Sequence, residues 1–250
     1  MKHPLRTLFP LLGVCIILLV WHLIFLFSDS LFLPSPFDVI KTLGLLLTQE
    51  QILKDMLATL GRIFVSLALA ISIAIPLGLI LGMYSKIYDL FAFVIDFLRS
   101  IPPPTLFPLF MVLIGLGNAA KIIPTALTCS FYLLINTMYG VRNVKKLRIR
   151  VGQIWGLSKL KMMVHILIPE AAPYIAAGLR LAISISIIVV ILSEMFAGTT
   201  FGIGQRILYF QLLYDIPEMY AMILLAGLLG YTLNTLYLAL EHRFIHWSGK

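Results

Sequence analysis

Charged residues are scarce in this chain: Asp, Glu, Lys and Arg make up only 12% of its 250 residues, while 60% are hydrophobic. The mean hydropathy is +1.01. This composition excludes an ordinary soluble globular domain and indicates a protein that crosses a membrane several times. The net charge of +8 would suggest nucleic acid in a soluble chain. Here the positive charges cluster beside apolar segments, so membrane orientation explains them better and we expect no nucleic-acid partner.

Motifs of catalysis and of cofactor binding are also missing. The two cysteines, Cys15 and Cys129, lie far apart in apolar runs, so we predict neither a disulfide framework nor a metal site. The sequence contains no phosphate-binding Gly-x-x-x-x-Gly-Lys loop, no His-Glu-x-x-His and no Gly-x-Ser-x-Gly. We therefore expect no catalytic residue, no metal and no cofactor in this chain, and any ATP must bind to another chain.

The apolar runs predict an all-α polytopic membrane protein with about six membrane-spanning helices. The first run lacks a small-residue cleavage site, so we expect a retained anchor rather than a signal peptide. The third is the weakest, because its uncharged part is too short to cross the bilayer and must recruit the charged segment before it. The expected spans are Leu8–Phe27, Ile63–Met83, Ile87–Leu98 joined to Thr105–Leu116, Ile122–Val141, Tyr174–Ala197 and Tyr220–Leu240.

Three successive prolines, Pro102, Pro103 and Pro104, separate the halves of the third span. Proline removes a backbone donor and clashes with the preceding turn, so we predict that no continuous helix passes this point. Irregular backbone at membrane depth needs cover from protein or from a water-filled cavity. Two compatible interpretations follow: a broken helix that lines a translocation path, as in many transporters, or an interfacial helix that turns into a short span.

Positive charge concentrates in one loop, between the fourth and fifth expected spans. Because Lys and Arg favour cytoplasmic loops, this asymmetry places both termini and that loop on the cytoplasmic side. The loop holds seven of the 19 Lys and Arg residues: Arg142, Lys145, Lys146, Arg148, Arg150, Lys159 and Lys161.

The same stretch, Arg142–Pro169, which we call the elbow, also carries two helical patterns. Gly156 is expected to end the first helix, Ser158 to cap the second and Pro169 to stop it. The apolar stripes are Leu147, Val151, Ile154 and Trp155 on the first helix, and Leu160, Met163, Val164 and Leu167 on the second.

The spacing from Gly156 to Ile166-Leu167-Ile168-Pro169 carries a resemblance to a known family. The elbow is similar to the cytoplasmic loop of permease subunits of bacterial ATP-binding-cassette (ABC) importers, where Glu-Ala-Ala, three residues and Gly precede an Ile-x-Leu-Pro-like end by about ten residues. The branch it resembles serves nitrate, sulfonate, taurine, bicarbonate or thiamine-precursor uptake. Further matching segments are Leu33-Pro34-Ser35-Pro36, Leu60-Gly61-Arg62, residues 97–103, Gly140-Val141-Arg142, Gly178-Leu179-Arg180, Ser193-Glu194-Met195 and Gly202-Ile203-Gly204.

The resemblance implies the type I ABC importer permease fold. It implies an N-terminal anchor and periplasmic connector over residues 1–56 and a permease core over 57–245. Coupling helices would lie at about 145–168 and a cytoplasmic tail at 246–250.

The resemblance also implies partners and a location. They are a second copy of this permease, cytoplasmic ATPase subunits that hold ATP and Mg, a periplasmic or lipid-anchored solute-binding protein, and the bacterial inner membrane. The solute would be a small anion or a small organic molecule. The residues implied in ATPase coupling are Arg150, Val151, Gly152, Ile154, Trp155, Gly156, Leu157, Ser158 and Pro169.

One departure from the family concerns Arg150, which stands with Val151 and Gly152 where the family has Glu-Ala-Ala. Three interpretations stay open: the ATPase carries compensating acidic residues, docking depends on the apolar face, or coupling is altered. The basic elbow could instead bind anionic lipid headgroups, although that attraction would not require the glycine spacing.

Few polar residues in the spans are candidates for the translocation path. Glu194, near the outer end of the fifth span, is interpreted as a gate or lining residue, with a headgroup-level position as the alternative. Arg62 is as well explained by extension to the headgroups as by substrate contact. Gly78 and Gly82 form a small-xxx-small pair that predicts close helix packing.

Two other classes of protein are alternatives to an importer permease. A secondary transporter of inverted repeats should show two matching halves, and the first three spans do not match the last three. A multi-span membrane enzyme should cluster His, Asp or Glu at one leaflet, whereas the acidic residues here are scattered.

Overall fold

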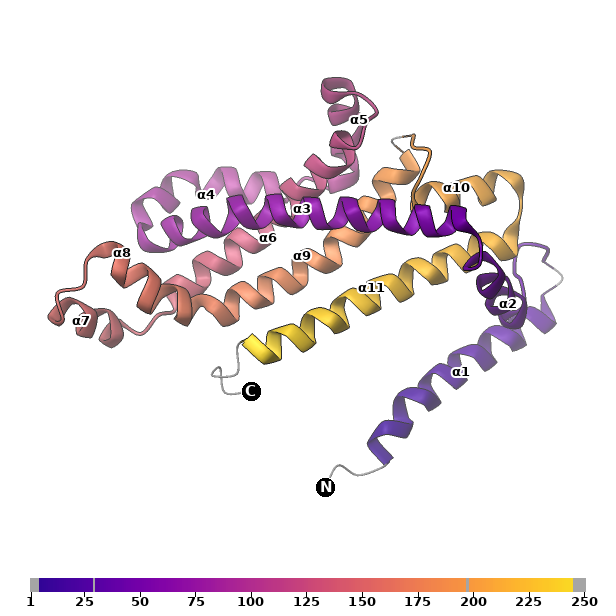
Figure 1. The fold of residues 1–250 in the computed structure, drawn as a ribbon, viewed down its shortest axis with the longest axis horizontal. Helices are drawn as coiled ribbons and strands as arrows, with labels where there is room; N and C mark the ends of the chain where they lie inside the picture. Colours follow the sequence, from indigo (N-terminus) through magenta and orange to yellow (C-terminus); the bar gives the residue numbers. More distant parts are fainter. Residues whose placement is uncertain (1–4, 29, 197, 245–250) are drawn as a thin grey trace.

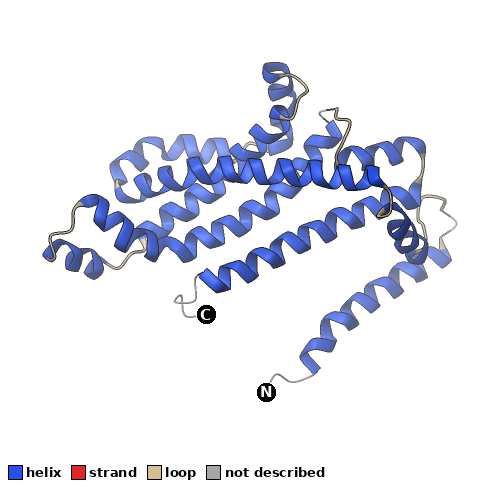
Figure 2. Cartoon of the chain, in the orientation of Figure 1, coloured by secondary structure: helices blue, strands red, loops and turns tan. Residues whose placement is uncertain are grey.

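The computed structural model describes residues 5–28, 30–196 and 198–244, and within those residues it contains helices and no strand (Figure 2). This confirms the predicted all-α class. The predicted tail at 246–250 and Ala197 of the fifth predicted span lie outside the described residues. In chain order the helices are α1 (Leu5–Phe27), α2 (Pro36–Leu46), α3 (Glu50–Met83), α4 (Ser85–Arg99), α5 (Pro103–Ile114), α6 (Ala119–Arg142), α7 (Lys146–Ile154), α8 (Lys159–Met162), the π-helical turn η1 (Met163–Leu167), α9 (Ile168–Phe196), α10 (Ile203–Leu213) and α11 (Ile216–Phe244).

The bundle is built on α6, which packs against both α3 and α9, while α11 runs beside α9 (Figure 1). The contact between α3 and α6 is close because it is lined by glycines. A Cβ added to Gly78 would lie 2.7 Å from the Cβ of Thr137, and one added to Gly82 would lie 2.6 Å from the Cβ of Val141. The predicted small-residue packing of Gly78 and Gly82 is therefore confirmed.

Within the described residues, four helical stretches are long and apolar enough to span a membrane: Glu50–Met83, Ala119–Arg142, Lys159–Phe196 and Ile216–Arg243. They contain the predicted second, fourth, fifth and sixth spans, and α1 covers the first. The helix of the second span begins at Glu50, before the predicted start, because the charged residues of its first turns are paired within the protein instead of ending it. The predicted boundary between connector and core, at residue 57, falls inside α3, and that division stays a prediction.

The third predicted span is broken at the prolines. Helices α4 and α5 meet at an angle of 92° and could together count as a fifth span. Pro102 is the N-cap of α5 and Pro103 its first residue, where the missing N–H would have no helical partner in any case. The prediction that no continuous helix passes this point is confirmed, and α5 projects away from the rest of the bundle (Figure 1).

Pro169 does not stop a helix, and that prediction was wrong. The chain runs helically from Lys159 to Phe196, with the π-helical turn Met163–Leu167 directly before α9. A proline clashes with the carbonyl four residues earlier, and a widened turn removes that clash without ending the helix. The elbow is therefore continuous with α9.

The two ends of the bundle carry different elements. Helices α7 and α8 lie at one end, toward which the C-terminal part of α11 also points, while α2 and α10 lie at the other (Figure 1). This placing is compatible with the predicted cytoplasmic side for the elbow, and the orientation itself stays a prediction.

Candidate functional site

The first helix of the elbow ends in a tight glycine turn. Gly156 has a φ of +69°. Its N–H donates to the carbonyl of Gln153 at 3.0 Å, and the N–H of Leu157 donates to the carbonyl of Gly152 at 3.0 Å. The two bonds form a Schellman cap, in which glycine takes the left-handed conformation at no steric cost. The predicted role of Gly156 as the end of this helix is confirmed.

The second helix begins immediately afterwards. The Ser158 hydroxyl accepts a hydrogen bond from the N–H of Lys161 at 3.4 Å, so the predicted N-cap is also confirmed. Only one residue, Leu157, separates the glycine cap from the serine cap. The connection between the two helices therefore has little conformational freedom.

The elbow is held against the start of α9. A Cβ on Gly152 would lie 2.7 Å from Cδ1 of Ile166 and 2.8 Å from Sδ of Met162, so the bare glycine lets α7 sit directly on the second helix. Arg148 of α7 also forms an ion pair with Glu170 of α9. These contacts attach α7 to the long helix behind it.

The outward face of α7 is apolar and uncovered. Ile154 is 83% exposed and Trp155 is 79% exposed, and Leu147 and Val151 are exposed beside them. These four residues, which we call the apolar knob, are the first stripe predicted from the sequence. Large apolar side chains grouped and exposed on a strongly charged segment mark an interaction surface.

The cations of the elbow are almost all without carboxylate partners. Among the described residues, Arg148 alone of the seven cations predicted there forms an ion pair. The side chain of Arg150 is exposed and makes no hydrogen bond or ion pair within the described chain. The predicted coupling residues lie on α7 and in the turn that follows it, except for Pro169, which belongs to the first turn of α9. Their part in ATPase coupling stays a prediction.

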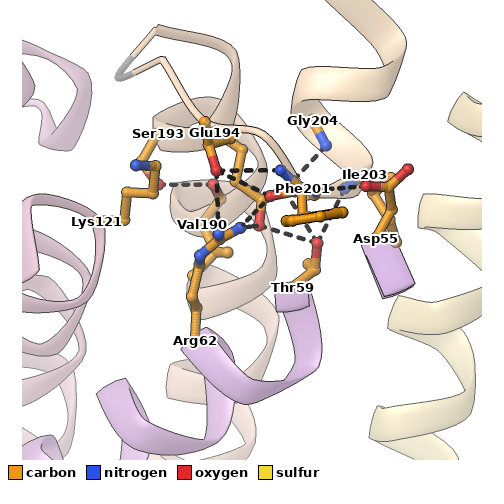
Figure 3. Close-up of polar contacts among 12 residues, drawn as sticks. Asp55, Thr59, Arg62, Lys121, Val190, Ser193, Glu194, Phe201, Ile203 and Gly204 are labelled. Atoms are coloured by element: carbon orange, nitrogen blue, oxygen red, sulfur yellow. Dashed lines mark hydrogen bonds and ion pairs between the residues drawn. The ribbon is translucent and has the colours of Figure 1, made fainter. Parts of the chain in front are cut away.

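The opposite end of the bundle contains a buried ion pair. Glu194, on the last turns of α9, is completely buried, and its Oε1 accepts from Nη1 of Arg62 of α3 at 2.5 Å. The Thr59 hydroxyl donates to the same carboxylate at 2.9 Å. The other donors of the guanidinium bind Asn118 and Thr199. The guanidinium also donates to the carbonyl of Phe201 (Figure 3). The suggestion that Arg62 extends to the headgroups was wrong, because its donors are used inside the protein.

A second ion pair adjoins the first. The carboxylate of Asp55, also completely buried, accepts from Nε of Arg206 at 2.8 Å. We call Asp55, Thr59, Arg62, Glu194 and Arg206 the buried polar network. It joins α3 to α9 and α10, which lie more than 80 residues further along the chain.

The network also caps α10. The N–H groups of Gly202, Ile203 and Gly204 donate to Asp55, Thr59 and Glu194 at 2.9, 3.0 and 2.9 Å, respectively. The first N–H groups of a helix have no partner within it and form its positive end, so carboxylates there are favourable. Three side chains from two other helices therefore fix where α10 begins.

The residues predicted for the translocation path are not in one place. Pro104 lines an apolar cavity of about 450 Å³ with Phe107 and Pro108 of α5 and with Phe196 at the end of α9. Glu194 lies two residues before Phe196 but belongs to the buried polar network and does not line that cavity. The assignment of Glu194 and of Pro102, Pro103 and Pro104 to the path stays a prediction.

Sequence reasoning missed Asp55, Thr59 and Arg206. Asp55 and Arg206 lie outside the predicted spans, where charged residues are ordinary, yet the structure buries Asp55 at the beginning of α3. The sequence did contain a signal, because polar residues at helical spacing form a stripe along one face of α3. The stripe is Asp55, Thr59, Arg62 and Ser66, and all four are buried.

Long apolar helices, with a buried polar network at one end and an exposed helical elbow at the other, are the architecture of a polytopic membrane permease. Residues 74–246 match the family described as the binding-protein-dependent transport system inner membrane component, and the chain belongs to that family.

Individual relatives agree with this membership. A probable ABC transporter permease protein of Brucella abortus (strain 2308) is 27% identical over 230 residues, covering 92% of this chain and 91% of the relative. The taurine transport system permease protein of Escherichia coli (strain K12) is 26% identical over 244 residues, covering 95% and 88%. A solved structure of the MetNI methionine ABC transporter in an inward facing conformation matches with a TM-score of 0.66 and 21% identity, over 78% of this chain and 95% of that one. The family, the branch and the type I permease fold predicted from the sequence are confirmed.

Proposed function

We propose that this chain is the membrane-spanning subunit of an ATP-driven importer and that the apolar knob docks it to a cytoplasmic ATPase. The observation that supports this most directly is the exposure of Ile154 and Trp155 on a helix that is capped, short and attached to the bundle. Apolar side chains on a rigid helix fit a groove in a partner, since little conformational entropy is lost on binding.

The structure offers a route from the docking surface to the far end of the bundle. From Lys159 to Phe196 the chain is one helical stretch of 38 residues. A displacement of the ATPase would move α7, and through the Arg148–Glu170 pair and the packing of Gly152 it would move this helix. At its other end Glu194 connects the helix to α3 and α10. Closure of the ATPase would thus reach the opposite end of the bundle as a rigid-body motion.

The remaining partners follow from the family and from the proposed mechanism. Two copies of the permease would form the translocation path, and a binding protein would deliver solute at the end that carries α10. ATP and Mg would be held by the ATPase subunits, in the inner membrane of a bacterium. The relative named as a taurine permease supports a small anion or a small organic molecule as the solute.

The basic residue at position 150 is compatible with this mechanism if the apolar knob provides most of the docking energy. Arg150 is exposed beside Val151 and has no partner in the described chain. In protein interfaces, buried aromatic anchors contribute most of the affinity, whereas exposed charges at the rim chiefly adjust the association rate.

Co-purification with the ATPase encoded beside this permease tests the proposal. Trp155→Ala should weaken the association by about tenfold or more, as expected for a hot-spot aromatic residue. Gly156→Pro should abolish it, because proline cannot adopt the φ of +69°. Gly44→Ala is the matched control, since Gly44 is exposed on α2 and an added Cβ would meet nothing within 4 Å. Undiminished association and transport in the Gly156→Pro variant would exclude the docking role.

A further inference from the structure

A cavity lies behind the elbow and has no part in the proposed coupling mechanism. Its volume is about 440 Å³, and it lies where the ends of α3 and α6 meet α7 and α8. Its apolar lining includes Val141, Val144 and Leu167, which are buried in one core cluster. A cavity of this size can hold a small ligand or part of a larger one.

The charged lining of this cavity is entirely cationic. Arg142, Lys146 and Lys159 line it, and no acidic residue does. The guanidinium of Arg142 is held in place, because Nη2 donates to the carbonyl of Leu81 at 3.3 Å and the group stacks 4.2 Å from the ring centre of Tyr88.

The side chains of the two lysines have no partner among the described residues. Neither the Lys146 nor the Lys159 ammonium group makes a hydrogen bond or an ion pair there. Three cations around an apolar cavity, without a carboxylate, complement a ligand that has an anionic head and an apolar stem.

The position of the cavity indicates where such a ligand comes from. It adjoins Met83 and Arg142, the last residues of two helices that are long and apolar enough to span the membrane. The ends of spanning helices lie at the level of the lipid headgroups. Basic pockets between membrane helices bind the headgroups of anionic lipids.

We infer that this cavity binds the phosphate headgroup of an anionic phospholipid, with the upper part of the lipid stem against its apolar wall. The site is separate from the apolar knob, whose Leu147, Ile154 and Trp155 do not line it. The inference goes beyond the proposed function and does not depend on it: a bound lipid would support the elbow from behind whether or not an ATPase docks in front.

The test compares two double variants with the same change of charge. Lys146→Gln with Lys159→Gln removes the free cations of the cavity, while Lys145→Gln with Lys161→Gln removes two neighbouring cations that do not line it. The full-length chain is placed in phosphatidylcholine nanodiscs with and without phosphatidylglycerol, and retained phosphatidylglycerol is counted by native mass spectrometry. At about fivefold for each lysine, the first pair should lower the affinity for phosphatidylglycerol by about 25-fold, and the second pair by much less.

Each other outcome counts against the inference. Equal losses in both pairs would mean diffuse attraction of the basic elbow to the membrane. An equal rise in apparent Tm with inorganic phosphate and with phosphatidylglycerol would make the site one for free phosphate. Unchanged lipid retention in the first pair, combined with lost binding of the ATPase, would make these lysines part of a protein interface. All four lysines are exposed, so the apparent Tm of each variant in zwitterionic detergent should stay that of the parent chain.

Discussion

The two ends of this bundle use charge in opposite ways. At the elbow, cations are numerous, exposed and, with the exception of Arg148, without a carboxylate partner in the described chain. In the buried polar network, Arg62 and Arg206 each meet a completely buried carboxylate. Unpaired exposed charge is available to a partner outside the chain, whereas paired buried charge fixes the arrangement of helices within it.

The largest effect is expected from breaking the network. Glu194→Ala would leave the guanidinium of Arg62 buried without its carboxylate and would remove the acceptor of the Gly204 N–H. Removing one partner of a buried pair costs about 3–5 kcal/mol, so the apparent Tm in detergent should fall strongly.

The exposed pair Glu50–Lys54 on the same helix as Arg62 provides the control for Glu194→Ala. Its side chains are 81% and 53% exposed, so Glu50→Ala should change stability by about 1 kcal/mol or less. If the two variants melt at the same temperature, the buried pair does not hold the helices together as described.

A smaller but clear loss of stability is expected from Gly204→Ala. The added Cβ would lie 2.1 Å from the carbonyl oxygen of Ile191, and backbone cannot move aside as a flexible side chain can. Overpacking of this kind costs about 1–3 kcal/mol, measured as a fall in apparent Tm. Gly227→Ala on α11 is the comparison, because the added Cβ would meet nothing within 4 Å and alanine favours a helix. A stable Gly204→Ala variant would mean that α10 can begin elsewhere.

Local features of the elbow could be predicted because their causes lie within a few residues. A glycine after a periodic stretch and a serine before the next one gave both caps, Gly156 and Ser158, correctly. Pro169 was mispredicted because the rule that proline ends a helix assumes α-helical hydrogen bonding on its N-terminal side. The π-helical turn Met163–Leu167 removes that condition.

The buried polar network could be predicted only in part, because its contacts join distant segments. Asp55 and Arg206 are 151 positions apart, and nothing near either residue indicates the other. Glu194 was recognised as an unusual carboxylate in an apolar helix, but its partner Arg62 was expected to meet either the headgroups or the substrate. The polar stripe on α3 identifies which face of that helix is buried, and it does not identify what that face meets.

The smallest effect is expected from Arg150→Ala at the elbow. Because Arg150 has no partner in the described chain and is exposed, stability should change by about 0.5 kcal/mol or less. A charge at the rim of an interface acts on the rate of association, so we expect a change of a few-fold in ATPase binding at low salt that disappears at high salt. The measurement is the association rate at two ionic strengths, beside Trp155→Ala, whose effect should persist in salt. If Arg150→Ala weakens ATPase binding as much as Trp155→Ala at both ionic strengths, charge and not the apolar knob provides the docking energy. The unpaired cations of the elbow would then hold the ATPase by ion pairs, as the paired charges of the network hold helices together within the chain.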